Sequence, residues 1–188
     1  SQPVGPQLLQ RIGPTIELSL ASLLVGVGIA FPIGILSAVK PGSKLDVIAS
    51  FFSQIGVSVP SFWRGILLIL LFSLTLGWLP PSGYTPFGED AGDWFSHLIL
   101  PAVTSGIVSA SILTRFIRSA MLDVLNMNYI QTARAKGLTE QTVTTRHALR
   151  NALISIVTII GLQVTALMSG VVIVEVVFGW PGLGRLAL

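Results

Sequence analysis

Four long apolar segments dominate this sequence, and each is long enough to cross a lipid bilayer. A membrane-spanning helix needs about 20 mostly apolar residues. The segments that reach this length lie at residues 16–39, 47–78, 98–120 and 152–177. We therefore predict an all-α fold, a polytopic transmembrane helical bundle with about four membrane spans in a single domain over residues 1–188.

The composition supports a lipid environment and removes several kinds of site from consideration. Hydrophobic residues make up 52% of the chain and charged residues 10%, whereas a soluble domain carries about 25% charged residues. There is no cysteine, and His97 and His147 are the only histidines. Disulfides and thiolate metal sites are thus excluded, and a histidine-based metal site or catalytic triad lacks the necessary residues. We expect no enzyme activity, no metal and no cofactor on this chain.

The charged residues predict an orientation in the membrane. The net charge of +3 and the isoelectric point near 9.8 would also suit a nucleic-acid partner, but the basic residues adjoin apolar segments, which favours the lipid bilayer. Eight basic residues lie in the last turns of the third segment or in the loops after the first and third segments: Lys40, Lys44, Arg115, Arg118, Arg134, Lys136, Arg146 and Arg150. The loop 79–97 holds Glu89, Asp90 and Asp93 and no Lys or Arg. By the positive-inside rule the basic loops are cytoplasmic, loop 79–97 is outside, and both ends of the chain face outward.

Two residues interrupt the second apolar segment. Pro60 lies inside residues 47–78, so we expect a kinked or broken helix there. Arg64 follows it, and a charge at membrane depth is costly and usually faces a cavity or a partner. Arg64 either reaches the membrane surface or belongs to a translocation path, where it would contact a substrate carboxylate.

The fourth segment also carries two polar residues with open roles. Gln163 is a candidate hydrogen-bonding residue of a translocation path, although packing between helices explains it equally well. Glu175 has the chemistry to bind a substrate amine. The alternative is a structural role, in which Glu175 holds the turn 179–184, together with Arg185.

The stretch 123–151 is the long polar segment on the predicted cytoplasmic side. Residues 129–136 are good helix formers that end in basic residues, which suits the C-terminal end of a helix dipole. Gly137 fits the position after the helix, where a left-handed backbone is needed, and Thr139 is a plausible N-cap with Glu140 in the next first turn. The sequence predicts a compact helix–glycine–helix elbow that continues into the fourth segment; by composition alone, an ordinary basic loop held at the lipid headgroups fits equally well.

The residues of this elbow resemble a known family. Tyr-Ile-Gln-Thr-Ala-Arg-Ala-Lys-Gly-Leu at 129–138, followed by Arg-His-Ala-Leu-Arg-Asn-Ala-Leu at 146–153, closely resembles the "EAA" loop of ABC-importer permeases. Within them it is most similar to the peptide/nickel branch, the dipeptide and oligopeptide permease B-type subunits. The segment Glu-Val-Val-Phe-Gly-Trp-Pro-Gly-Leu-Gly-Arg-Leu at 175–186 is similar to a second signature of that branch. One departure is Gln131, which replaces the glutamate that gives the loop its name.

The resemblance implies a fold and a coupling site. The fold is that of type I ABC importer permeases (MetI-like), and members have further helices before and after this region, so we expect the chain to be a fragment. The elbow would dock in a groove of an ATP-binding subunit. The residues expected to make this coupling site are Tyr129, Thr132, Ala133, Arg134, Ala135, Lys136, Gly137, Leu138, Arg146 and Arg150. Of these, Ala133 and Ala135 would allow close approach, and Arg134, Lys136 and Arg146 would pair with acidic groups of the partner.

The resemblance also implies the partners. The chain has no phosphate-binding loop of the kind G-x-x-x-x-G-K-[ST], so ATP and magnesium would be bound by two partner ATP-binding subunits. A second homologous permease subunit and an extracytoplasmic substrate-binding protein complete the expected assembly in a bacterial inner membrane. Short peptides are the favoured cargo; nickel, glutathione or another small solute is the alternative.

Two other classes of function fit the sequence less well. An ion-coupled secondary transporter or channel would need acidic or histidine relays inside the membrane, and the apolar segments provide only Glu175 and, at the very edge of the first segment, Glu17. An intramembrane enzyme would need clustered His, Asp or Ser residues at membrane depth. Neither class explains the cytoplasmic elbow.

Overall fold

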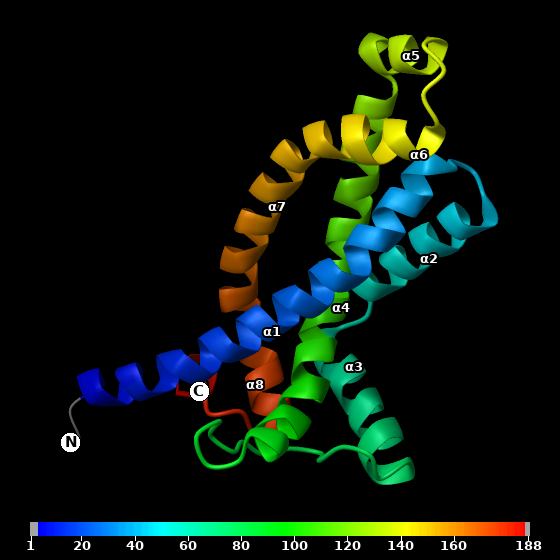
Figure 1. The fold of residues 1–188 in the computed structure, drawn as a ribbon. Helices are drawn as coiled ribbons and strands as arrows, with labels where there is room; N and C mark the ends of the chain where they lie inside the picture. The colour runs from blue at the N-terminus through cyan, green and yellow to red at the C-terminus, as the bar shows by residue number, and fades with distance from the viewer. Residues whose placement is uncertain (1–3, 187–188) are drawn as a thin grey trace. The chain divides into compact units, whose positions relative to one another are not determined.

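A computed structural model describes residues 4–186, and this part of the chain consists of helices and their connections, without a β-strand (Figure 1). The elements are α1 (Val4–Val39), α2 (Lys44–Ser58), α3 (Ser61–Leu68), the π-helix η1 (Ile69–Thr75), α4 (Ala91–Leu125), α5 (Asn128–Ala135), α6 (Glu140–Thr142), the π-helix η2 (Val143–Ala148), α7 (Leu149–Gly170), α8 (Val172–Phe178) and α9 (Leu183–Leu186). The prediction of an all-α chain is confirmed.

Three helical stretches among the described residues are long and apolar enough to cross a membrane. They are Leu8–Val39, Ala91–Leu125 and Glu140–Gly170. The α2 helix and the α3–η1 pair meet this test only together, and the pair is bent by 105°, as in a broken span or a re-entrant loop. Pro60 lies at the break, with φ −58° and ψ 141°, because proline lacks an amide hydrogen and its ring clashes with the preceding helical turn. The expected break in the second apolar segment is therefore present, and the described residues provide three membrane-spanning helices, or four if the bent pair is one span.

The chain divides into two compact units, and the boundaries between them fall inside α1, α4 and α7 and at the end of α2. Unit 1 comprises residues 1–26, 58–109 and 163–188, and unit 2 comprises residues 27–57 and 110–162. Each unit therefore combines segments that are far apart in the sequence, and each has a hydrophobic core of its own.

The core of unit 1 gathers around the end of α8 and the residues that follow it. Its buried members are Leu18, Leu98, Leu100, Ala102, Val171, Val174, Phe178 and Trp180. Trp180 is fully buried, and its ring meets that of Tyr84 edge to face, with the centroids 4.7 Å apart. Edge-to-face aromatic contacts of this kind add stability beyond the burial of their area.

The core of unit 2 joins α1 and α4 to the helices of the predicted elbow. Its buried members are Ala30, Ala38, Leu113, Ile117, Met121, Val124, Leu125, Ile130, Ala133, Val143, Ala148, Ala152 and Ile156. Gly34 of α1 allows a close helix contact, since a Cβ atom there would lie 2.8 Å from Ile117 Cγ2. The elbow is thus built onto the same core that holds α1 and α4 together.

Candidate coupling site and membrane path

The elbow has the local structure that its sequence predicts. The α5 helix ends at Ala135, and Gly137 follows with φ +80°. This left-handed conformation strains residues with a Cβ, so glycine is the residue that suits the turn. Thr139 then caps α6, because its side-chain oxygen accepts a hydrogen bond from the backbone N–H of Thr142. These two local signals place the second helix directly after the first.

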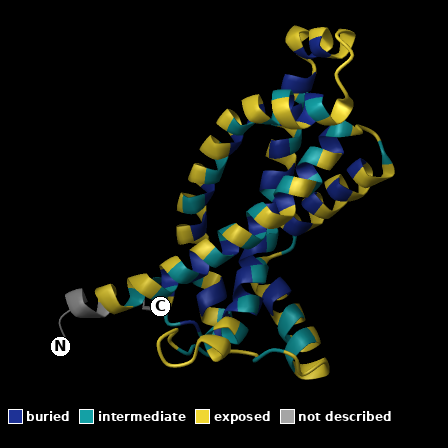
Figure 2. Ribbon diagram, viewed as in Figure 1, coloured by how far each residue is buried: buried dark blue, intermediate teal, exposed yellow. Residues whose placement is uncertain are grey.

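The elbow buries apolar residues in the core of unit 2 and exposes polar residues on its outer side. Ile130 and Ala133 on α5 and Val143 and Ala148 on η2 are buried in the core, whereas most of the surface of α5 and α6 is exposed (Figure 2). The exposed members of the expected coupling site are Tyr129, Thr132, Arg134, Ala135, Lys136, Gly137, Leu138, Arg146 and Arg150. Ala133 differs from the others: it packs inward, so its small side chain serves the fit of α5 onto the core.

Arg134 has a partner within the elbow. Its Nε donates a 2.7 Å hydrogen bond to Glu140 Oε1, and its Nη2 donates a 3.2 Å hydrogen bond to Glu140 Oε2. This bond to Glu140 raises the pKa of the Arg134 guanidinium above its ordinary value. Both side chains are exposed, and solvent and salt screen such pairs. From the sequence we expected Arg134 to pair with an acidic group of a partner. In the structure, Arg134 links α5 to α6 across Gly137.

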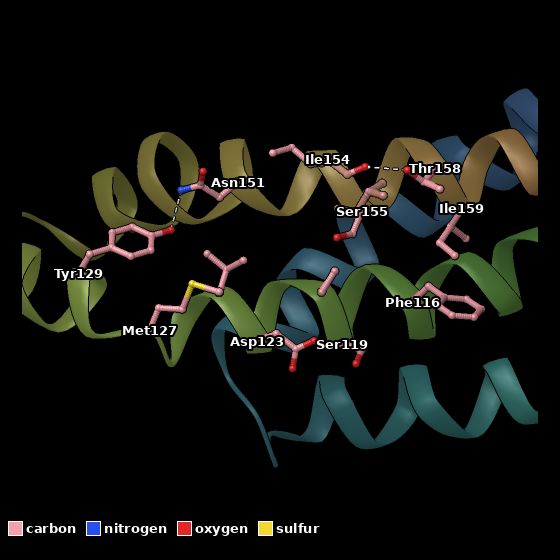
Figure 3. Close-up of a pocket in the computed structure, with 13 residues that line it drawn as sticks. Phe116, Ser119, Asp123, Met127, Tyr129, Asn151, Ile154, Ser155, Thr158 and Ile159 are labelled. Atoms are coloured by element: carbon pink, nitrogen blue, oxygen red, sulfur yellow. Dashed lines mark hydrogen bonds between the residues drawn. The ribbon is translucent and has the colours of Figure 1, made fainter.

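A hydrogen bond between Tyr129 and Asn151 ties α5 to α7 (Figure 3). Asn151 Nδ2 donates to Tyr129 Oη over 2.6 Å and to His147 O over 3.1 Å. Asn151 was not among the expected site residues, because an asparagine near the start of an apolar helix carries no signal of a distant partner. The bond fixes the side of α5 that faces the first turns of α7.

A groove of about 710 Å³ lies beside this bond in unit 2. It runs between the second half of α4 and the first half of α7, with mainly apolar side chains along it and Asp123, Tyr129 and Asn151 at the end near the elbow (Figure 3). The remaining lining residues are Phe116, Ser119, Ala120, Val124, Met127, Ile154, Ser155, Ile156, Thr158 and Ile159.

The three candidate path residues are buried and all belong to unit 1. Arg64 on α3 is 7% exposed, Gln163 on α7 is 9% exposed, and Glu175 on α8 is fully buried. Arg64 is followed by Gly65, where a Cβ atom would lie 3.2 Å from the side chains of Val177 and Phe178. The α3 helix therefore packs closely on α8 next to Arg64.

Glu175 is held by hydrogen bonds from two distant parts of unit 1. Thr15 Oγ1 donates a 2.6 Å hydrogen bond to Glu175 Oε1, and the backbone N–H of Gly184 donates one of 2.7 Å to Oε2. A Cβ atom on Gly182 would overlap the Glu175 carboxylate. Arg185 also holds the turn, as expected, since its Nη1 donates to Gly179 O over 3.0 Å. In this conformation the carboxylate fastens the glycine-rich turn to α1.

The same stretch of α1 receives three aromatic side chains. Trp180 Nε1 donates to Pro14 O over 2.8 Å, and Glu17 Oε2 accepts from Trp94 Nε1 over 3.1 Å and from Tyr84 Oη over 3.4 Å. Burial raises the pKa of the Tyr84 phenol, and the negative charge of the nearby Glu17 carboxylate raises it further. Pro14 and Glu17 were not predicted as site residues, because their roles depend on residues more than 60 positions away.

Comparison with protein families identifies the chain. Residues 30–188 match the family described as binding-protein-dependent transport system inner membrane component. The chain belongs to this family. As a member, it is a membrane component of a transport system, and the family resemblance read from the elbow and the glycine-rich turn is confirmed.

Curated relatives extend over nearly the whole chain. It is 44% identical over 186 residues to the oligopeptide transport system permease protein AppB of Bacillus subtilis, a match that covers 98% of this chain and 59% of AppB. It is 39% identical over 206 residues to the dipeptide transport system permease protein DppB of Escherichia coli, covering 97% of this chain and 61% of DppB. The chain thus spans about three-fifths of the length of these relatives.

Solved structures show the fold. An inward-facing MetNI methionine ABC transporter chain superimposes with a TM-score of 0.77 at 21% identity, covering 100% of this chain and 81% of that chain. A chain of an amino acid ABC transporter gives a TM-score of 0.74 at 18% identity, covering 98% of this chain and 77% of that chain. The predicted fold of type I ABC importer permeases is confirmed.

Proposed function

We propose that this chain is a membrane-spanning subunit of an ATP-driven ABC importer and that it couples the ATPase to uptake. The observation that carries the proposal is the construction of the elbow. Two short helices are locked around Gly137, fixed from inside by Ile130 and Val143, and exposed on their outer surface. A rigid knob of this kind can receive force from a partner without deforming.

In this proposal the elbow fits a groove of an ATP-binding subunit. Leu138 is 40% exposed at the turn and provides an apolar anchor, as buried apolar anchors do at the centre of protein interfaces. The exposed side chains of Lys136, Arg146 and Arg150 supply positive charge that suits acidic groups of a partner. Closure of two such ATP-binding subunits around ATP and magnesium would push the elbow, and the spans would alternate between inward-open and outward-open states.

The orientation and the remaining partners belong to the same proposal. The distribution of Lys and Arg over the loops supports a cytoplasmic elbow, with both ends of this chain on the outer side. A second homologous permease subunit would complete the translocation path, and an extracytoplasmic binding protein would deliver the cargo. This chain would bind no nucleotide, and its role in ATP hydrolysis would be mechanical.

Short peptides are the proposed cargo. The support is the 44% and 39% identity to relatives named as oligopeptide and dipeptide permeases. Arg64, Gln163 and Glu175 remain the candidate path residues. Arg64 suits a peptide carboxylate by charge, whereas Glu175 would have to release Thr15 and Gly184 before it could bind a peptide amine.

Co-purification and transport in one preparation test the proposal. The full-length permease would be isolated from its native membrane with a tag, the bound subunits would be identified, and the complex would be reconstituted into vesicles with its binding protein. We expect an ATP-binding subunit in the complex and ATP-dependent uptake of a labelled dipeptide. Unlabelled tripeptide should compete with the dipeptide and reduce this uptake. A complex without an ATPase would refute the coupling role, and uptake of nickel ion in place of peptide would refute the cargo.

A further inference from the structure

In unit 2, α4 is joined by a charged pair to the first turn of α2, just after the turn between α1 and α2. The turn covers residues 40–43, and Gly42 has φ +75°. Arg118 of α4 donates from Nε to Asp46 Oδ1 over 2.6 Å and from Nη2 to Asp46 Oδ2 over 2.8 Å. Two parallel bonds between a guanidinium and a carboxylate are among the strongest and most directional contacts in proteins.

The carboxylate of this pair is itself fixed in place. Asp46 is 4% exposed, and its Oδ2 also accepts a 2.8 Å hydrogen bond from the backbone N–H of Gly42. The Ser43 hydroxyl oxygen accepts a 3.3 Å hydrogen bond from the Asp46 backbone N–H. One buried side chain thus connects the α1–α2 turn, the first turn of α2 and α4.

The neighbouring residue of α4 holds α1. Ile117 is 1% exposed and lies against Gly34, where a Cβ atom would also be 3.0 Å from Thr114 O. Ile117 and Arg118 therefore hold both helices of the α1–α2 hairpin. From Arg118 the same helix runs on to Leu125, next to the elbow, a rise of roughly 10 Å at about 1.5 Å per residue.

We propose that Asp46 and Arg118 are positioning residues that transmit movement of the elbow to the α1–α2 hairpin. This inference rests on the proposed coupling function. The buried residues of the elbow share one core with α1 and α4, so the elbow and α4 move together. An apolar contact such as that of Ile117 with Gly34 can slide, whereas a bidentate ion pair sets both direction and register. The pair makes α2, which leads in the sequence to the break at Pro60, follow the elbow.

The test uses the complete transporter with its ATPase subunits in vesicles. The variants are Asp46→Asn, Arg118→Gln, the double variant, and Arg118→Lys, which keeps the charge but loses the bidentate geometry. Arg115→Gln is the matched control, because Arg115 is an exposed arginine one turn earlier on α4. For each variant we would measure the amount of assembled complex, the ATPase rate and the peptide taken up per ATP hydrolysed.

We expect the complexes to assemble and hydrolyse ATP, while Asp46→Asn and Arg118→Gln lower uptake per ATP about tenfold, equivalent to about 1.4 kcal/mol. The double variant should be no worse than either single one, since both remove the same interaction. Arg118→Lys should recover part of the uptake. Unchanged uptake per ATP, additive losses, an equal loss in Arg115→Gln, or a loss explained entirely by less complex would each overturn the proposal. A parent complex without ATPase, or without ATP-dependent uptake, would instead refute the coupling function.

The distance between the elbow and α2 provides a second readout, which a defect in transport would not change by itself. The chain contains no cysteine, so spin labels can be attached at Lys44→Cys on α2 and Thr145→Cys on the elbow, both exposed positions. We expect one narrow distance distribution that stays constant when ATP is added, because unit 2 moves as one body. With Asp46→Asn the distance should change or broaden with ATP. A constant distance in that variant would contradict the proposal.

Discussion

The phenol of Tyr129 and the amide of Asn151 lie 2.6 Å apart, and this bond joins the first helix of the elbow to the start of α7. The two residues are 22 positions apart, and both border the groove between α4 and α7. The elbow is therefore attached to α7 by a polar contact on one side, as well as to the core of unit 2 by its apolar residues.

Removing the Tyr129 hydroxyl should loosen the elbow without displacing its core. Tyr129→Phe deletes the acceptor of the Asn151 amide, and we expect a loss of about 0.5–1 kcal/mol in local stability, the lower part of the usual range because the site is exposed. Hydrogen exchange of the α5 amides in the intact complex would measure it. Thr158→Val is the control, since that hydroxyl bonds only to Ile154 O of its own helix. Equal exchange in parent and Tyr129→Phe would contradict the prediction.

A β-branched residue at position 137 should block coupling. Gly137→Val forces a side chain into the left-handed region, which costs about 1–2 kcal/mol, and the turn between α5 and α6 must change to relieve it. We expect ATP-dependent uptake to be lost while the amount of protein in the membrane stays at the parent level. Gly28→Ala is the control, because a Cβ atom there has no neighbour within 4 Å. Normal uptake by Gly137→Val would refute the importance of this turn.

The glycine-rich turn after α8 should not accept a larger residue at position 182. A Cβ atom on Gly182 overlaps the Glu175 carboxylate, and overpacking of this kind costs about 1–3 kcal/mol. Gly182→Ala should therefore lower the melting temperature of the purified transporter in detergent. Gly88→Ala, with open space around its Cβ, should leave the melting temperature unchanged. A Gly182→Ala melting temperature equal to that of the parent would show that the Glu175 side chain moves aside freely.

Thr15 should matter through its hydroxyl alone. That hydroxyl donates to Glu175 Oε1 and accepts a 2.8 Å hydrogen bond from the Leu183 backbone N–H. Thr15→Val keeps the shape but leaves a buried carboxylate oxygen and an N–H without this partner, at a cost of about 1–3 kcal/mol. Thermal unfolding should show the loss, and Thr15→Ser should restore most of it. If Thr15→Ser were as unstable as Thr15→Val, the methyl group rather than the hydroxyl would be responsible.

Several features of this protein were determined by the sequence alone, because their physical causes are local. The length of the apolar segments predicts the helices that can cross a membrane. Pro60 lies at the break between α2 and α3, since proline disfavours a helix interior, although Pro101 lies inside α4. Gly137 and Thr139 end one short helix and begin the next through their own backbone and side chains. The motifs of the elbow and of the glycine-rich turn were sufficient to indicate the family.

Only the tertiary structure decided which side chains meet. Glu175 binds Thr15, 160 residues away, and Asp46 binds Arg118 across 72 positions. From the sequence we expected Ala133 to contact the ATP-binding partner, but its side chain faces the core. We expected Arg134 to pair with the same partner, but it is paired with Glu140. Helix formation depends on neighbours within a few residues, whereas burial and pairing depend on which distant helices pack together. The elbow itself was predicted from local signals. Only the tertiary packing shows that α4 connects it to the α1–α2 hairpin.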